Sequence, residues 1–403
     1  MNNVLISGAS IAGPALAFWL RRQGMRVTVV ERARELRPGG YAVDVRGAAL
    51  DVILRMGLRD VLRPLETDTL SNSVVDAQGR RFGRVERGFG VIDPEDIEIH
   101  RGDLARVLYE TTREDVTYRF GDSIAAIEQD DTGVDVAFES GARERFDLVV
   151  GADGVHSRTR ALVFGPEDAF VHQLGSRMAI FSAPNHIGLD REQLLFSAVG
   201  RIASIKSANR NRDVKVSLFY QAEPGPFDHR DVDAQRAEVH RAFASAGWDF
   251  PRLLEAMWTA DDFYCDVTCQ VRMPCYHRGR VALIGDAAYC PSPLSGQGSS
   301  LALVGAYVLA SALRELPRDP GKALERYDAN VRPFVAKNQE IAIKIASGFA
   351  PTSPFQVWMR NAAMRLLPRM PGAGAMMKLA MRGVRDASRA IALPCEGQAS
   401  AAT

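Results

Sequence analysis

The chain has 403 residues, of which 46% are hydrophobic, and its 50 Lys+Arg nearly balance 49 Asp+Glu, for a formal net charge of +1. At roughly 150 residues per domain, this length predicts two or three domains around a large buried core. The near-zero net charge argues against a broad field for nucleic acid or an anionic membrane, and without a run of about 18 apolar residues we expect no membrane span.

The N-terminus and the cysteines indicate a cytoplasmic protein without a metal centre. Residues 1–3 run directly into an apolar segment and show none of the regions of a signal peptide. Five cysteines, an odd number in a long chain, do not indicate a disulfide framework. Cys265, Cys269 and Cys275 have no histidine at zinc-finger distance after them, so buried thiols are the better interpretation.

The first 31 residues follow the order strand, tight turn, helix, strand, acid. Residues 4–7 are typical of an apolar strand, residues 14–22 of a helix, and residues 26–30 of a second strand that ends at Glu31. This order is that of a dinucleotide-binding unit. NAD(P) and FAD are both compatible with it, and a plain helix-packing turn is the structural alternative.

The loop between that first strand and the helix is the predicted phosphate site. Gly8 permits a tight turn, Gly13 lets the helix pack close to the strand, and the helix N-terminus offers free N–H groups to a pyrophosphate. Ser10 stands where the fingerprint normally has its middle glycine, and its side chain is small enough to be tolerated. The residues expected to contact the cofactor here are Gly8, Ser10, Ala12, Gly13, Glu31 and Arg32.

Two further strands end in an aspartate. Residues 145–150 lead to Asp153-Gly154, and residues 279–284 lead to Gly285-Asp286 and a loop that opens a long apolar helix. Ligands of open α/β sheets sit at the carboxyl ends of the strands. Each turn taken alone is equally compatible with a common structural loop.

Antiparallel strands are predicted in two further regions. A meander is expected over segments 116–120, 124–127 and 134–138, and a hairpin over 73–75 and 81–82. Segments 178–181, 193–196, 202–205 and 214–220 are expected to join that hairpin in one antiparallel sheet that roofs the ligand site. Phe181, Phe196 and Phe219 are candidates for its substrate-facing wall, although alternate phenylalanines are more often plain core.

From residue 325 onward the chain is typical of helices. Six of its twelve methionines lie between Met359 and Met381. Such adaptable side chains suit either the closure of a pocket or the docking of a tail helix on the body or on a partner.

Together, the three motifs resemble the FAD-dependent aromatic hydroxylases, the class A flavoprotein monooxygenases that include para-hydroxybenzoate hydroxylase and the tetracycline-degrading monooxygenases. The resemblance spans about residues 1 to 345. It implies that the first loop and Glu31 hold the ADP half of FAD, that Asp153 and Gly154 serve FAD and the nicotinamide cofactor, and that Asp286 binds the ribitol. It also implies flavin-ring contacts from Pro293, Gly296, Gln297, Gly298 and Ser299, and a further FAD contact from Arg101. Arg46 is a candidate to face the flavin, and an exposed charge at a strand end is the equally weighted alternative.

The sequence departs from that family at three positions. It has Tyr289 where relatives often carry His, Ser300 where they often carry Asn, and Gly305 where they often carry Asp. These changes leave the backbone cradle for FAD intact and bear on how the flavin ring is positioned. Tyr289 is a further candidate substrate contact.

The fold implied by the resemblance is α/β: a glutathione-reductase-type, Rossmann-like FAD-binding domain, an antiparallel-sheet substrate domain and C-terminal helices. The expected FAD-binding domain is discontinuous and comprises residues 1–70, 98–165 and 275–345. The expected substrate domain comprises residues 71–97 and 166–274. Residues 346–403 form the expected C-terminal helical segment.

The implied activity is that of a monooxygenase that uses FAD, NADPH or NADH, and dioxygen to hydroxylate an aromatic or polyketide-like small molecule through a flavin C4a-hydroperoxide. The flavin carries the difficult step, so no side chain is assigned as catalytic. A monomer or homodimer is expected. The alternatives are a flavin-dependent reductase on the same scaffold and a non-catalytic flavin- or ligand-binding protein; a halogenase is disfavoured because no two tryptophans lie two residues apart.

Overall fold

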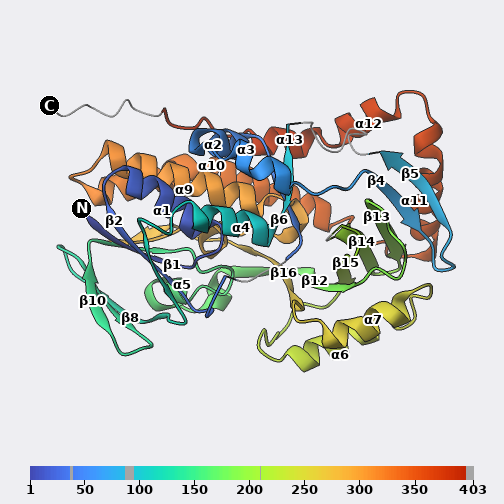
Figure 1. Cartoon of the computed structure of the whole chain (residues 1–403), viewed down its shortest axis with the longest axis horizontal. Helices are drawn as coiled ribbons and strands as arrows, with labels where there is room; N and C mark the ends of the chain where they lie inside the picture. The colour runs from blue at the N-terminus through green and yellow to red at the C-terminus, as the bar shows by residue number, and fades with distance from the viewer. Residues whose placement is uncertain (37–39, 87–94, 209, 396–403) are drawn as a thin grey trace.

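Two large sheets occupy opposite ends of the molecule (Figure 1). The computed structural model describes residues 1–36, 40–86, 95–208 and 210–395. Residues 87–94 of the expected substrate domain and 396–403 of the expected C-terminal segment therefore lie outside the described residues. Within the described ranges, no helix is long and apolar enough to cross a bilayer.

The first sheet is parallel except at one edge. Its order is β17-β18-β11-β1-β2-β7, and only β17 pairs antiparallel with its neighbour. The strands are β1 (Asn3–Ser7), β2 (Arg26–Glu31), β7 (Thr117–Phe120), β11 (Leu148–Gly151), β17 (His277–Arg278) and β18 (Val281–Leu283).

Successive side chains of β1 are buried on opposite faces of the sheet, and the sequence of this strand is therefore apolar at consecutive positions. Val4 and Ile6 belong to the core shared with α1 (Ala12–Arg22) and α9 (Gly298–Glu315). Leu5 packs instead against the meander of β8 (Ile124–Gln129), β9 (Val134–Phe138) and β10 (Arg143–Phe146). The parallel sheet is thus covered on both faces.

The meander differs from its prediction at both ends. Segment 117–120 was expected in the meander but forms β7, which pairs parallel with β2. The single strand expected over 145–150 is two strands, because the chain leaves the meander at Asp147 and enters the parallel sheet beside β1. The Asp147 carboxylate accepts hydrogen bonds from the backbone of Asn2 and Asn3, which fixes this crossing point.

The second sheet has seven strands in the order β16-β12-β15-β14-β13-β4-β5. The hairpin and the four strand segments predicted for the roof of the ligand site all belong to this sheet. The sheet is antiparallel except where β4 pairs parallel with β13. Parallel pairing needs a long connection, and the chain builds the meander and the strands β7 and β11 of the parallel sheet between β5 and β12. The strands are β4 (Ser71–Val75), β5 (Arg81–Glu86), β12 (Val171–Pro184), β13 (Glu192–Ala198), β14 (Arg201–Ala208), β15 (Asp213–Gln221) and β16 (Tyr264–Val271).

The two faces of the seven-stranded sheet separate the three candidate phenylalanines. Phe181 and Phe196 are buried in the core beneath α6 (Val232–Phe243) and α7 (Phe250–Thr259). Phe219 lies on the opposite face, where its ring meets Phe349 at 5.1 Å. The expectation of one shared aromatic wall is wrong, because the pairing places Phe181 opposite Val216 and Phe219 opposite Met178.

A small sheet and several helices connect the two ends. Strands β3 (Ala42–Val45) and β6 (Ile97–His100) pair antiparallel. The buried Lys206 of β14 reaches from the seven-stranded sheet to Glu98 of β6, so the face opposite α6 and α7 is turned toward this small sheet. The remaining helices are α2 (Ala48–Met56), α3 (Arg59–Leu62), α4 (Arg101–Glu110), α5 (Arg158–Phe164), α8 (Asp286–Tyr289), α10 (Pro320–Ala346), α11 (Pro354–Leu366), α12 (Ala373–Ala380) and α13 (Arg382–Ser388).

Two departures from the family pattern form one structural unit in the core. Tyr289 is fully buried, and its hydroxyl lies 3.2 Å from that of Tyr327, which donates to the Leu283 carbonyl. A Cβ placed on Gly305 would overlap the Tyr289 hydroxyl. The small residue on α9 therefore makes room for the large one on α8, and Tyr289 is a core side chain that does not line the cavity described below.

Replacing Gly305 with alanine is expected to destabilise the fold by about 1–3 kcal/mol, the usual cost of overpacking a core. Thermal unfolding followed by circular dichroism measures the change. The double variant Y289F/G305A should recover part of the loss, because it removes the overlapping hydroxyl. G374A, in an open position of α12, is the matched control; an equal loss in G374A and G305A would contradict the explanation.

Candidate functional site

A cavity lies where the carboxyl end of the parallel sheet meets the small sheet and the seven-stranded sheet. The loop after β18 supplies one wall, β3 and the residue before it a second, and β12 and β16 a third. Five of the predicted cofactor residues line this cavity: Asp286, Pro293, Gly296, Gly298 and Ser299. The cavity therefore lies at the carboxyl end of the parallel sheet, where the sequence motifs predicted a ligand.

Besides Ser292, four larger polar side chains of the cavity were not predicted. Tyr41 and Asp44 come from β3 and its approach, and Tyr264 and Asp266 come from β16. The alternation of residues 42–45, next to the candidate Arg46, could have identified Asp44 as a strand residue facing the site. Nothing local in the sequence distinguishes Tyr264 or Asp266, since β16 reaches the cavity only through its pairing with β12.

The first loop is held in a backbone arrangement that excludes side chains. Gly8 has φ +111°, and a Cβ there would collide with the Ala152 carbonyl at the end of β11. A Cβ on Gly13 would overlap the carbonyl of Gly8. The two glycines therefore allow the loop, the helix and the neighbouring strand to approach at backbone distance, as a phosphate-binding turn requires.

Arg101 is brought to this loop from the start of α4. Its Nη1 donates a 2.7 Å hydrogen bond to Oγ of Ser10, which places a guanidinium beside the N-terminus of α1. Charge and free N–H groups thus converge at one point, which suits a pyrophosphate.

Glu31 lies on the other side of the loop. Its carboxylate accepts hydrogen bonds of 2.9 Å from the backbone N–H groups of Ala9 and Ala33. This fixes an acidic group at the end of β2, where the fingerprint places the contact with the ribose. Arg32 beside it is exposed.

The Asp153-Gly154 turn is stabilised from within. The Asp153 carboxylate accepts from the backbone N–H of Thr159 at 2.9 Å and from its hydroxyl at 2.8 Å, and also from Ser157. Gly154 has φ +84° with open space around its α-carbon. The carboxylate thus shapes the turn, and the backbone at Gly154 is the part left open to a ligand.

A buried arginine joins this turn to the Asp286 turn. Arg160 has no solvent exposure, and its guanidinium donates to the carbonyls of Val155 at 2.6 Å and Ala287 at 3.0 Å. The two turns follow strands β11 and β18, which are neighbours in the sheet. One side chain therefore sets the spacing between two of the three sequence motifs.

Gln297, which lies between two residues that line the cavity, has unpaired polar atoms. Neither amide atom of Gln297 has a hydrogen-bond partner among the described residues, although the side chain is buried, and the same holds for Nδ1 of His100. Buried amides almost always have partners. Gln297 also precedes α9, whose 18 residues direct their positive N-terminal end toward the cavity. An amide that can donate and accept, next to a positive helix end, fits the polar edge of a flavin ring.

The walls of the cavity shift the pKa of its acidic side chains. Partial removal from bulk water raises the pKa of Asp286, whose side chain stays accessible, and it also raises the pKa of Asp44, where Arg46 at 2.6 Å acts in the opposite direction. Burial, together with the Asp286 charge, raises the pKa of Tyr41 to about 12, so its phenol stays protonated at neutral pH. The site therefore offers a neutral hydroxyl donor beside carboxylates.

His156, which follows the Asp153 turn, is a doubly hydrogen-bonded cation. Burial alone lowers its pKa, but hydrogen bonds to Asp266 at 3.1 Å and Glu167 at 2.9 Å outweigh that effect and raise the pKa to about 10. Asp266 also accepts from the hydroxyl of Tyr264 at 2.7 Å. The imidazolium thereby connects the turn after β11 to strand β16 across the cavity wall.

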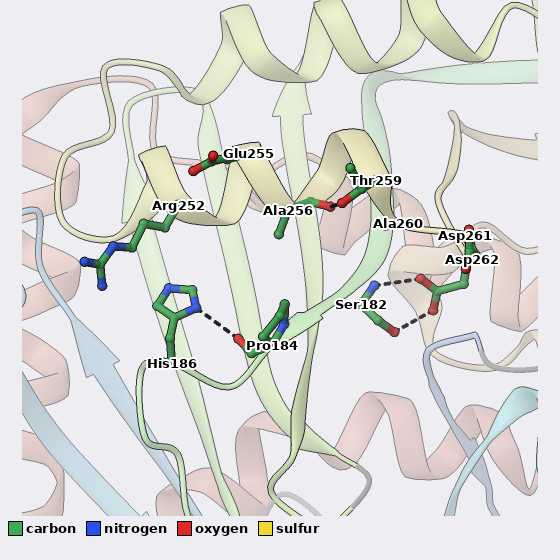
Figure 2. A pocket seen from close by; sticks show the side chains of 10 residues that line it. All are labelled: Ser182, Pro184, His186, Arg252, Glu255, Ala256, Thr259, Ala260, Asp261 and Asp262. Carbon is green, nitrogen blue, oxygen red and sulfur yellow. Dashed lines mark hydrogen bonds between the residues drawn. The ribbon is translucent and has the colours of Figure 1, made fainter.

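A second, open depression lies on α7, away from the predicted residues. Figure 2 shows Arg252, Glu255 and Thr259 along the helix, facing the segment that carries His186. At its end, Asp262 accepts from Ser182 and is paired with a lysine, so its carboxylate is already satisfied. No predicted site residue lines this depression.

Comparisons with known proteins show the family to which the chain belongs. The model of a family described as FAD binding domain matches residues 1–342. An uncharacterized protein of Mycobacterium tuberculosis is 44% identical over 354 residues, which cover 87% of this chain and 95% of that protein. A flavin-dependent monooxygenase of Legionella longbeachae is 37% identical, with 86% and 89% covered.

Among solved structures, the crystal structure of the tetracycline destructase Tet(51) is similar over the whole chain. It superposes with a TM-score of 0.86 at 33% identity, covering 98% of this chain and 100% of that one. The predicted resemblance to FAD-dependent hydroxylases is thereby confirmed, as is the α/β class of the fold.

The His156 cation gives the fold a defined pH dependence. Its pKa of about 10 lies above the ordinary value of 6.5, so its stabilising effect is complete below about pH 6.5 and is lost as the pH rises toward 10. The difference in unfolding free energy between wild type and H156Q should therefore shrink over that interval, as measured by urea denaturation. H240Q, on the exposed end of α6, is the control and should show no such trend; a gap that widens with pH would refute the assignment.

Proposed function

The chain belongs to the family described as FAD binding domain and, within it, to the flavin-dependent monooxygenases; on that premise we propose that it hydroxylates an aromatic or polyketide-like small molecule with NADPH or NADH and dioxygen. The observation that carries the proposal is the span along the carboxyl edge of the parallel sheet, from the Arg101–Ser10 contact at the Gly8 turn to the loop that holds the unpartnered Gln297 and lines the cavity. Such a span suits an extended dinucleotide.

The residues proposed to hold FAD fall into three groups along this span. The ADP half would contact the loop from Gly8 to Gly13, with Glu31 at the ribose, Arg32 beside it and Arg101 at the pyrophosphate. Asp286 would take the ribitol, and Gly154 would present its backbone nearby. The flavin ring would lie against the segment that leads from the turn after α8 into α9, through Pro293, Gly296, Gln297, Gly298 and Ser299.

Bound FAD would supply the redox chemistry, which takes a hydride from the nicotinamide and lets one oxygen atom of dioxygen enter an electron-rich ring. The protein would hold the flavin and the substrate in position and would exclude water from the cavity. The N-terminus of α9 would stabilise negative charge on the pyrimidine edge. Tyr41, whose phenol is protonated at neutral pH, would donate a hydrogen bond within the cavity.

The substrate is proposed to lie under the face of the seven-stranded sheet that is turned away from α6 and α7. Met178 of that face lines the cavity, and Phe219 is its cross-strand partner. The strong likeness to a tetracycline destructase supports a polycyclic, oxygenated ligand. Phe181, Phe196 and Tyr289 are not part of this proposal, because all three are fully buried core residues.

The same reasoning supports the proposed domain division. Residues 1–70, 98–165 and 275–345 would form a glutathione-reductase-type, Rossmann-like FAD-binding domain around the parallel sheet. Residues 71–97 and 166–274 would form the substrate domain, and residues 346–403 the C-terminal helical segment. The binding of FAD and of the substrate on different sheets would then make the cavity a domain interface.

The purified protein is expected to carry FAD, with absorption bands near ~375 and ~450 nm that bleach with NADPH and recover in air. Addition of a polycyclic aromatic substrate should accelerate NADPH oxidation and consume oxygen in step with hydroxylated product. Oxidation without oxygen uptake would assign the reductase alternative. Tight ligand binding without NADPH oxidation would assign a binding protein, and failure to bind added FAD would refute the cofactor.

Replacing Arg101 with alanine is expected to weaken FAD binding by about 10–100-fold, the effect of losing a charge-assisted hydrogen bond to phosphate. Flavin fluorescence quenching on titration of the apoprotein measures the dissociation constant. R106A, on the same helix and paired with Asp103 at the surface, is the matched control and should bind FAD as the wild type does. Unchanged affinity in R101A would remove Arg101 from the site.

A further inference from the structure

The C-terminal arm, defined as residues 354–389, exposes an unusual amount of apolar surface. No side chain of helix α11 is fully buried, and its Phe355 and Trp358 are 66% and 65% exposed. Leu379 of α12 is 68% exposed. Four more large apolar residues of the arm have about half of the side chain exposed: Met359, Leu366, Met370 and Met376. Contiguous exposed apolar groups of this size mark interaction sites on natural proteins.

The exposed groups on α11 share one face of the helix. Phe355, Trp358, Met359 and Leu366 recur at helical spacing, and the first two rings stack at 6.0 Å. The opposite face, which includes Met364, is applied to β5, where a Cβ on Gly83 would meet the Met364 carbonyl. The helix therefore packs with one side and presents an apolar stripe with the other.

The arm is fixed to the body at two places. In the last turn of α11, the guanidinium of Arg365 lies 4.3 Å from the centre of the Phe82 ring. At the end of the arm, Nδ2 of Asn338 on α10 donates to the Ala387 carbonyl at 3.2 Å. Figure 1 shows α11 and α12 together at the end of the molecule that carries β4 and β5. The apolar side chains are thus held outward on an anchored segment.

The arm is also strongly basic. Residues 354–389 contain seven arginines and lysines but only one acid, Asp386, so the arm carries a formal charge of +6 while the whole chain carries +1. The remainder is therefore acidic, at −5. Two of the basic groups contact carboxylates, Arg365 at 3.7 Å from Asp76 and Arg382 at 3.6 Å from Asp386. The near-zero net charge of the chain conceals a separation of charge between the arm and the body.

We propose that the C-terminal arm docks the protein on the surface of an anionic lipid bilayer. Aromatic and aliphatic groups next to Lys and Arg are the composition of a helix that lies in the membrane interface. Tryptophan favours that interface, and anionic headgroups attract the basic residues. A protein partner is less well matched, because protein interfaces gather apolar groups in a centre from which charges are depleted, whereas here the two kinds alternate along the arm.

The test is sedimentation of the full chain with phosphatidylcholine vesicles that contain about 30% phosphatidylserine, compared with vesicles of phosphatidylcholine alone. The wild type should partition to the anionic vesicles, and added salt should weaken binding. F355S/W358S and, separately, R369E/K378E should each lower the partition coefficient at least about tenfold. The fluorescence of Trp358 should shift to the blue on binding, and this shift should be absent in W358F.

Matched controls separate docking from a general change in the surface. W258S removes a tryptophan of α7 that is also solvent-exposed, at 41%, but lies outside the arm. R113E/R143E reverses two exposed charges outside the arm. Both variants should bind vesicles as the wild type does. Thermal unfolding confirms that each variant is folded. Absence of vesicle binding by the wild type, or equal binding by F355S/W358S, would overturn the proposal. Self-association abolished by F355S/W358S without vesicle binding would assign the stripe to a second copy of the chain.

Discussion

The structure depends on a close approach of three backbone segments at the carboxyl end of the parallel sheet. At Gly8 and Gly13 there is no room for a side chain, because the carbonyls of Ala152 and of Gly8 itself already occupy that space. The loop after β1, the helix that follows it and the end of β11 can therefore lie in direct contact. All the groups that suit a cofactor are arranged around this point, since strands β2 and β18 end beside it.

Polar side chains then connect this edge to the other parts of the chain. Arg160 joins the turns after β11 and β18 through their carbonyls, and His156 joins the first of these turns to Asp266 of the seven-stranded sheet. Arg101 reaches the phosphate loop from a helix 91 residues further along. Each connection is charge-assisted and at least partly buried, which makes it stronger than a surface ion pair. The cavity walls are thus held together by a few arginine and histidine contacts.

The large sheet and the C-terminal arm place their apolar and their polar or charged side chains in different ways. One face of the sheet is a conventional core under α6 and α7, and the other carries lysines and serines toward the small sheet. The arm buries little of its apolar surface and concentrates the positive charge of a protein that is otherwise acidic. Tyr289 and Gly305 show the same complementarity at smaller scale, since a change to a large residue on one helix is matched by a glycine on the next.

Local patterns in the sequence determined the strand-turn-helix order of the first 31 residues, six of the seven strands of the large sheet, and the loop from Pro293 to Ser299 that lines the cavity, because turn chemistry and periodicity act over a few residues. Strand β16 was not predicted. Only the tertiary structure decided which face each strand presents, and so moved Phe181 and Phe196 into the core. It also paired β4 parallel with β13, split segment 145–150 at Asp147, and brought Tyr264 and Asp266 to the cavity. A strand of period two has two equivalent faces, and the choice between them is made by partners distant in the chain.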